Sequence, residues 1–318
     1  MTFTTALGRT AAGQDGVVTT AQVLAAGYSA VEIARLVRHG HWTRIRRGTY
    51  VAAEVWRDLS PEEKHRLRVR AVSLRLGPMS VVSHHSAAVL LGLRLHAIPL
   101  DVVHVTHPRG GGSARREADV QHHEAVLPTQ DVVRTAGLPL TSPVRTALDL
   151  ARLVPHGSGV CAMDGVLANG VSRADLLAAH VRHLDWPGSR AAGRALAEAD
   201  GGSESVGETL QRLELAAVGW APDTLQHPIR TDIGTVRTDF AWPSRRLAGE
   251  FDGRVKYERL LRLGEAASDV VVRERRRELA IERAGWCVVR FTWAGLYDRE
   301  ALRRQMADAA RRAERYAS

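Results

Sequence analysis

A short acidic stretch near the end of the chain places the strongest constraint on the fold. Residues 237–253 form two runs of alternating apolar and polar residues around a turn-like break at 243–246, a pattern that predicts a β-hairpin. A turn centred on this break places Asp239 directly opposite Glu250. Asp252 then points to the same face as Glu250, because side chains alternate along a strand.

This arrangement of carboxylates favours a bound cation. Like charges directly opposed across two strands are destabilising, and three converging carboxylates offer the oxygen ligands that Mg²⁺ prefers, with Mn²⁺ as the alternative. A slip of one residue in the pairing would move one strand's carboxylates to the other face. The sequence therefore predicts a divalent-metal site that depends on the hairpin register.

The net charge of the chain indicates a polyanionic partner. The 318 residues carry a formal net charge of +9, and the isoelectric point is near 10.4. Such a balance favours nucleic acid ahead of an anionic membrane surface. The alternative is an arginine-rich composition inherited from a GC-rich genome.

The length of the chain suggests two or three domains.

Cysteine usage and hydropathy point to the cytoplasm. Cys161 and Cys287 are the only cysteines, too few for a disulfide framework and without the spacing of a zinc ribbon. The first residues lack a signal-peptide pattern, and no run reaches the roughly 18 apolar residues of a membrane helix. The loop at 109–112 lacks the lysine of a phosphate-binding loop. We therefore expect a cytoplasmic protein with no membrane partner and no small-molecule cofactor.

The N-terminal region has the order of a winged helix-turn-helix. Thr19 or Thr20 caps a short helix, Ser29 and Glu32 form a capping box that opens a second helix, and a basic hairpin turns at Gly48. In that fold the second helix enters the major groove and the wing touches phosphate. The alternative is a small helical cap without DNA contact. The candidate DNA-binding residues here are Arg35, Arg38, Arg44, Arg46 and Arg47.

The middle region shows helices and strands but no recognisable chemistry. Its patterns predict a helix from Ser60, a buried helix over 83–92, a strand over 100–106 and a helix over 141–152. Two histidine pairs, at 84–85 and 122–123, have diverging side chains and no carboxylate at ligand spacing. We expect satisfied or surface histidines there rather than a metal site.

The last third reads as an α/β unit of nuclease size. A Gly/Ser break precedes a capping box at Ser205 and Glu208, and the helix that follows ends near Gly219. The acidic hairpin, an arginine-rich helix around Arg275, a strand over 286–293 and a basic helix complete the order. Glu208 is a candidate site residue or only a capping residue, and Arg275 is a candidate DNA contact or part of a solvated face.

The N-terminal region resembles the abortive-infection type IV antitoxins of the AbiEi family. The resemblance rests on residues 16–24, 29–37 and 42–51, and the middle region is similar to the part that follows the winged helix in antitoxin-like proteins. The resemblance implies DNA binding and autoregulation of an operon, with a cognate toxin as a candidate partner.

The C-terminal region resembles the PD-(D/E)XK restriction-endonuclease-like fold, in the subgroup related to very-short-patch-repair endonucleases. The resemblance covers roughly residues 203–296 and implies metal-dependent hydrolysis of phosphodiester bonds. It departs from the family at Asp252, where the motif has lysine; the nearest lysine downstream is Lys256. The resemblance implies that Asp239 is the main metal ligand and Glu250 its partner. Asp252 and Glu208 would be outer ligands or water-positioning groups. Lys256 would contact the scissile phosphate or lower the pKa of the attacking water.

These observations predict a multidomain α/β (α+β) protein with three parts. They are a winged helix-turn-helix over 1–58, an antitoxin-like α/β middle region over 59–200, and a restriction-endonuclease-like α/β/α domain over 201–318. The leading hypothesis is a DNA-binding protein with a Mg²⁺- or Mn²⁺-dependent deoxyribonuclease domain. The alternative is a non-catalytic AbiEi-like antitoxin or transcriptional regulator with a degenerate nuclease domain.

Overall fold

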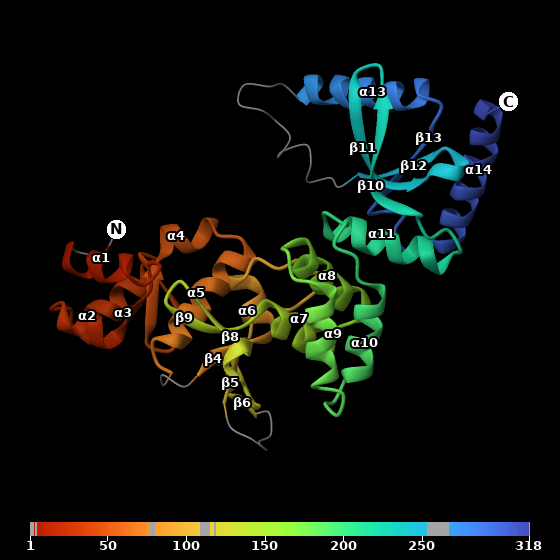
Figure 1. Cartoon of the computed structure of the whole chain (residues 1–318). Helices are drawn as coiled ribbons and strands as arrows, with labels where there is room; N and C mark the ends of the chain where they lie inside the picture. Colours follow the sequence, from red (N-terminus) through yellow and green to blue (C-terminus); the bar gives the residue numbers. More distant parts are fainter. Residues whose placement is uncertain are drawn as a thin grey trace. The chain divides into compact units, whose positions relative to one another are not determined.

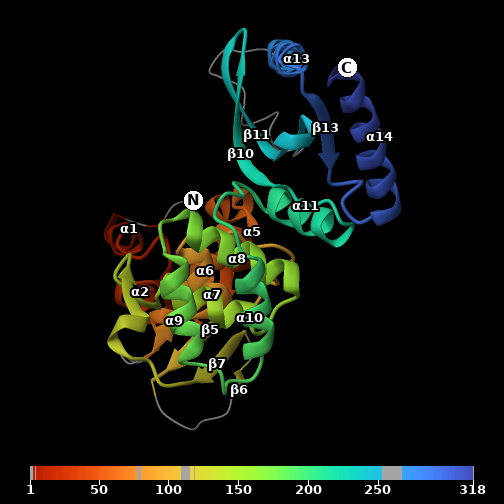
Figure 2. The ribbon, with the colours of Figure 1, turned by 45° about the vertical axis from the view of Figure 1, so that its right-hand side comes forward.

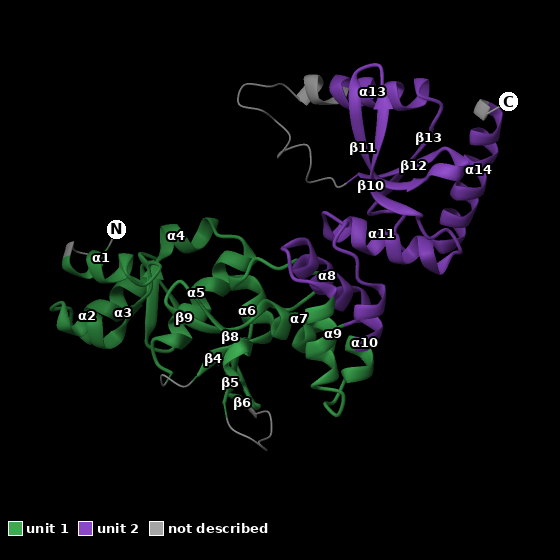
Figure 3. Ribbon diagram, in the orientation of Figure 1, with its two compact units in different colours: residues 1–154, 174–192 green, residues 155–173, 193–318 purple. Residues whose placement is uncertain are grey.

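The computed structural model describes residues 3, 5–76, 80–108, 115–117, 119–252 and 267–317. The chain divides into two compact units (Figure 3). Unit 1 comprises residues 1–154 and 174–192, and unit 2 comprises residues 155–173 and 193–318. The segment 155–173 therefore belongs with the C-terminal residues, although the sequence patterns assign it to the middle region.

Unit 1 begins with the predicted winged-helix arrangement (Figure 1). A three-stranded antiparallel sheet in the order β1-β3-β2 packs with three helices. Its core contains Leu7, Val23, Ile33, Trp42 and Tyr50, all buried. The elements are α1 (Thr5–Ala12), β1 (Val18–Thr19), α2 (Thr20–Ala25), α3 (Ala30–Arg38), β2 (Trp42–Arg46) and β3 (Thr49–Ala52).

Local hydrogen bonds explain where the winged-helix elements start and turn. Thr19 caps α2 and Ser29 caps α3, each as a complete capping box with a side chain three residues on. Gly48, with φ of 76°, makes the turn between β2 and β3, a conformation that glycine adopts without steric cost. These helix starts confirm the expectation from the sequence.

The rest of unit 1 is a mixed six-stranded sheet in the order β6-β7-β5-β4-β9-β8 with helices packed against it. The pairs β5–β7 and β4–β9 are parallel, and the others are antiparallel. The strands are β4 (Val81–Val82), β5 (Val103–His107), β6 (Arg115–Glu117), β7 (Val120–Glu124), β8 (Val132–Thr135) and β9 (Leu138–Thr141). The helical elements are α4 (Ala53–Asp58), α5 (Pro61–Ser73), α6 (His84–Leu90), η1 (Thr129–Asp131) and α7 (Pro143–Ala151). Helices α9 (Arg173–Val181) and α10 (Ser189–Glu198) span the points where the chain passes between the units.

Unit 2 is built on a four-stranded sheet in the order β10-β11-β12-β13, of which only the pair β12–β13 is parallel. The apolar core on one face includes residues of α11 and α14, and the core on the other includes Ile281 of α13 (Figure 2). This is an α/β/α arrangement. The elements are α8 (His156–Ala168), α11 (Val206–Ala217), β10 (Thr224–Thr231), β11 (Gly234–Trp242), η2 (Pro243–Arg245), β12 (Leu247–Asp252), α13 (Ala267–Arg283), β13 (Cys287–Thr292) and α14 (Arg299–Ala317).

The mixed α/β class and the winged-helix N-terminus confirm two expectations from the sequence. The order in unit 2 is helix, three strands, helix, strand and helix, where the sequence predicted two or three strands between the first two helices. Helices α8, α9 and α10 had no counterpart in the sequence reading. Among the described residues, no helix is both long and apolar enough to cross a membrane.

Candidate functional site

The hairpin register brings the acidic residues of unit 2 to one face of the sheet. Phe240 pairs with Gly249, so the next pair outward is Asp239 with Glu250, as the position of the turn predicts. Asp239 Oδ2 accepts a hydrogen bond of 2.8 Å from the main-chain N–H of Phe251. Asp252, at the end of β12, lies on the same face because it is two residues beyond Glu250.

Glu250 is the most perturbed of these carboxylates. It is 9% exposed, and burial raises the pKa of its carboxyl group, an effect that nearby Asp239 increases and Arg277 opposes. Arg277 Nη1 lies 2.7 Å from Glu250 Oε1 as an ion pair. Within the described part of the chain, however, this buried oxygen accepts no hydrogen bond. This oxygen already has the Arg277 guanidinium beside it, so a metal ion bound here would have to displace that contact.

A cleft of about 880 Å³ opens beside this face. Asp239 and Arg237 of β11 lie on one side, and basic side chains of α13 lie on the other. The cleft therefore places cationic groups next to the acidic face, a combination that can hold a phosphate close to a metal. The residues of α13 that line it are Arg273, Glu274, Arg276 and Arg277.

Three predicted site residues lie outside this arrangement. Glu208 is buried at the start of α11, where Oε1 accepts a hydrogen bond from Ser205 Oγ and Oε2 from the main-chain N–H of Glu204. These contacts stabilise the start of α11, and Gln226, which lines the cleft, also donates to Glu208 Oε2 at 3.1 Å. Arg275 is exposed and pairs with Glu278 at 2.9 Å, whereas its neighbours line the cleft. Lys256 lies outside the described residues.

The winged helix presents exposed arginines on two elements. Arg35 and Arg38 are exposed on α3, and Arg44 and Arg47 are exposed on the wing formed by β2 and β3. A hollow of about 670 Å³ between α3 and β2 is lined by Arg38 and Arg44, among others. Arg46 differs from the prediction, because its Nε donates to Asp119 Oδ1 at 3.0 Å. Its charge is therefore partly neutralised within unit 1.

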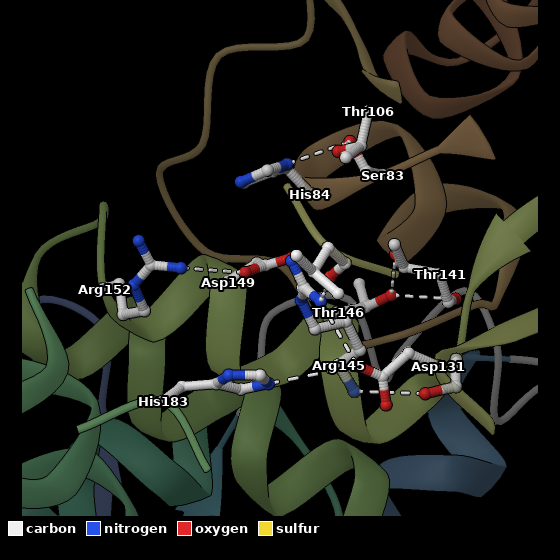
Figure 4. Close-up of polar contacts among 12 residues, drawn as sticks. Ser83, His84, Thr106, Asp131, Thr141, Arg145, Thr146, Asp149, Arg152 and His183 are labelled. Carbon is white, nitrogen blue, oxygen red and sulfur yellow. Dashed lines mark hydrogen bonds and ion pairs between the residues drawn. The ribbon is translucent and has the colours of Figure 1, made fainter. Parts of the chain in front are cut away.

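A buried ionic network in unit 1 was missed by the sequence analysis. Arg145, 2% exposed, lies 3.2 Å from Asp131 and 2.9 Å from Asp149 (Figure 4). Its guanidinium group lies over the ring of Trp186 at 4.4 Å, and Asp149 also pairs with Arg152 at 3.0 Å. The available signal was the charged pair at 145 and 149, four residues apart within an otherwise apolar capped helix.

Comparisons with known proteins support the AbiEi-like reading of the chain. Residues 9–53 match the family model described as "Transcriptional regulator, AbiEi antitoxin". Residues 80–196 match the model described as "AbiEi antitoxin C-terminal domain". The first match covers most of the winged helix, and the second covers the mixed sheet together with helices α6 to α10.

The relatives found come from Mycobacterium tuberculosis. The uncharacterized proteins MT2308 (strain CDC 1551 / Oshkosh) and Rv2248 (strain ATCC 25618 / H37Rv) are each 27% identical over 255 residues, covering 80% of this chain and 86% of theirs. Among solved structures, the crystal structure of the RV2827C protein from the same species is 18% identical. It has a TM-score of 0.39 and covers 61% of this chain and 77% of that one.

Proposed function

We propose that this protein is an AbiEi-type transcriptional regulator whose winged helix binds operator DNA. The observation that supports this most directly is the set of exposed arginines on α3 and on the wing, within the region that matches an AbiEi regulator model. The second helix of such a motif reads base edges, and the wing positions the protein on phosphates. The net charge of +9 adds long-range attraction to DNA.

Binding to the promoter DNA of its own operon tests this function. Fluorescence anisotropy at several salt concentrations should show affinity that falls with salt, because phosphate contacts release counterions. The double variant Arg35→Ala, Arg38→Ala should bind this DNA at least about tenfold more weakly, since one base contact contributes roughly 1–3 kcal/mol. Arg57→Ala, an exposed arginine on α4, is the matched control and should bind like the wild type.

The wing offers an internal test of the same proposal. Arg44→Ala should reduce the salt slope by about one unit if Arg44 contacts a phosphate. Arg46→Ala should have a smaller effect on DNA affinity, because Arg46 is paired with Asp119. Absence of salt-sensitive promoter binding, or equal binding by the α3 double variant, would reject DNA regulation by this module.

The antitoxin part of the proposal concerns a protein partner. Both matched families are described as AbiEi antitoxins, so a cognate toxin encoded beside this chain is the expected partner. Co-expression with the neighbouring gene is the test: growth arrest by that gene alone should be relieved by this chain. Arrest that persists when both proteins are expressed would contradict the antitoxin role and leave DNA binding unaffected.

Unit 2 supports a second candidate, a PD-(D/E)XK-like domain with metal-dependent deoxyribonuclease activity. The element order resembles that fold, Asp239 lines the cleft beside α13, and Glu250 contacts Arg277 of α13. The carboxylates of Asp239 and Glu250 would hold a Mg²⁺ or Mn²⁺ ion, which would replace the contact of Arg277 with Glu250 Oε1. Such an ion would supply charge neutralisation and water activation, while the α13 arginines would hold the phosphate.

Plasmid nicking separates an active from a degenerate domain. The purified protein with Mg²⁺ or Mn²⁺ should convert supercoiled DNA to nicked circles, and Asp239→Ala should remove this activity. Asp232→Ala, at an exposed turn where Asp232 pairs with Arg283, is the control that should retain it. If the wild type and Asp239→Ala nick equally, or neither nicks, unit 2 is a binding domain only.

A further inference from the structure

Three histidines from separate elements of unit 1 converge at one point. His84 begins α6, His104 lies on β5 and His123 lies on β7. One ring nitrogen from each lies within 4.8 Å of the others. His104 Nδ1 and His123 Nε2 are 3.0 Å apart, and the rings of His84 and His123 stack at 3.9 Å.

The sheet register explains why sequence neighbours separate and distant residues meet. Strands β5 and β7 are parallel, with Thr106 opposite His123, so His104 and His123 occupy the same face. His122 points to the other face, where its Nδ1 lies 2.8 Å from His107 Nε2. The side chains at 122 and 123 do diverge, as expected, but each meets a histidine of β5.

Contacts within unit 1 orient His84 toward the other two rings. Its Nδ1 lies 2.9 Å from Ser83 Oγ, which accepts a hydrogen bond of 2.8 Å from Thr106 Oγ1 (Figure 4). Metal-bound histidines commonly donate their second ring nitrogen to such a partner, which fixes the ring. His84 also has a φ of 50°, a left-handed conformation that is uncommon outside glycine and is concentrated at functional sites.

Burial disfavours the charged form of all three imidazoles. Burial is the main cause that lowers the pKa of His123 to about 4 and that of His104 to about 2. Burial also holds the pKa of His84 well below its usual value. Each ring therefore has one nitrogen with a lone pair at neutral pH.

A cavity of about 290 Å³ adjoins the cluster and is lined by His84, His123 and Thr106. Arg145 and Arg152 also line it; both are paired with Asp149, and Arg145 also with Asp131. Sites with three protein ligands and one open position are typical of zinc bound next to a cavity. Ligand nitrogens around tetrahedral zinc lie roughly 3.3 Å apart, and small ring rotations from the observed 3.0 Å would reach that value.

We propose that His84, His104 and His123 bind one Zn²⁺ ion, with its fourth position open to the adjoining cavity for water or a carboxylate. This site has no part in the DNA-binding function proposed above. It would link α6, β5 and β7, replacing the contact between His104 and His123 with bonds to the metal.

Zinc titration of the full-length protein tests the proposal. After treatment with a chelator and dialysis, isothermal titration should show one Zn²⁺ per chain, and Co²⁺ should give the visible absorption of a tetrahedral site. His84→Asn, His104→Gln and His123→Gln should each weaken zinc affinity at least about tenfold. Asparagine suits position 84 because it tolerates a positive φ. Ser83→Ala should weaken it about 10- to 100-fold, the usual cost of losing a residue that orients a ligand.

His122→Asn is the matched control on the same strand, and it should keep wild-type zinc affinity because His122 faces the opposite side. Zinc should raise the unfolding temperature of the wild type and the control, but not of the ligand variants. The proposal is overturned if the wild type binds no zinc, if all three ligand variants keep wild-type affinity, or if His122→Asn loses as much affinity as His123→Gln. Circular dichroism of the zinc-free variants checks their folding, and Ser83→Ala still decides the question where a ligand variant does not fold.

Discussion

Arg277 Nη1 lies 2.7 Å from Glu250 Oε1 on the face of the unit 2 sheet that α13 covers. This ion pair joins the arginine-rich helix to the acidic hairpin. It places a cation beside the buried carboxylate of Glu250. Arg277 also lines the cleft, so this ion pair joins the cleft to the acidic hairpin.

Replacing Glu250 with glutamine should stabilise unit 2 at neutral pH. Burial raises the pKa of Glu250, so folding is favoured by protonation of this group. Glu250 contributes its full stability to the folded state below the pKa that it has in the unfolded chain. This contribution is lost as pH rises through the higher pKa that Glu250 has in the folded protein. We expect Glu250→Gln to add roughly 0.5–2 kcal/mol to the unfolding free energy at pH 7, and no gain near pH 4. Hydrogen exchange of β11 and β12 amides measures this.

The exposed Glu300 on α14 provides the comparison, because Glu300→Gln should change stability by less than about 0.5 kcal/mol. A Glu250→Gln variant that is less stable than the wild type at pH 7 would show that the pair with Arg277 outweighs the cost of burial.

Gly207 should not tolerate a side chain. It lies in α11 against Phe251 of β12, and a Cβ atom at this position would be 2.1 Å from Phe251 Cε1. Phe251 is 3% exposed and cannot move freely, so Gly207→Ala should cost about 1–3 kcal/mol through overpacking. Thermal unfolding of unit 2 is the measurement, and Gly295→Ala, where a Cβ meets only ordinary contacts, should be nearly neutral. Equal effects of the two substitutions would contradict this packing.

Removing the buried Arg145 should strongly destabilise unit 1. Arg145→Met would leave Asp131 and Asp149, which are 3% and 1% exposed, without their main counter-charge. Breaking a buried ion pair in this way typically costs about 3–5 kcal/mol. Urea unfolding of unit 1 should show the loss, and adding Asp149→Asn should restore part of it. The exposed Arg134 on β8 is the control, since Arg134→Met should have little effect.

The stability of unit 1 should fall as pH drops below about 6.5. Burial lowers the pKa of His65 and of His123 to about 4, and that of His104 to about 2. Each histidine binds fewer protons when folded, so its contribution is complete above the unfolded pKa near 6.5 and is lost as pH falls toward the folded value. For each histidine, the unfolding free energy of unit 1 should fall by about 1.4 kcal/mol per pH unit as the pH drops from 6.5 toward the folded pKa. Hydrogen exchange of β5 and β7 amides, corrected for intrinsic rates, follows the loss.

A substitution that removes one of these groups provides the check. In the His65→Gln variant, the unfolding free energy of unit 1 should fall less steeply between pH 6.5 and about 4, because one of the three titrating histidines is missing. Protection of β5 and β7 that stays constant from pH 7.5 to 4.5 would contradict neutral burial of the cluster.

Features set by neighbours in the chain were predictable from the sequence. The capping boxes at Ser29 and Ser60 start α3 and α5 where expected, because their hydrogen bonds involve residues only three apart. The break at 243–246 set the hairpin register, so the pairing of Asp239 with Glu250 followed from counting residues outward from the turn. The winged-helix order and the AbiEi resemblance were likewise readable from contiguous segments.

Features set by contacts between distant segments needed the tertiary structure. Adjacency of His122 and His123 correctly predicted diverging side chains, but only the parallel register of β5 and β7 shows that His123 meets His104. The pairing of Arg46 with Asp119 and the burial of Arg145 depend on elements far apart in the sequence. Local hydrogen bonds and turn geometry are encoded within a few residues, whereas the order of strands in a sheet decides which distant side chains share a face.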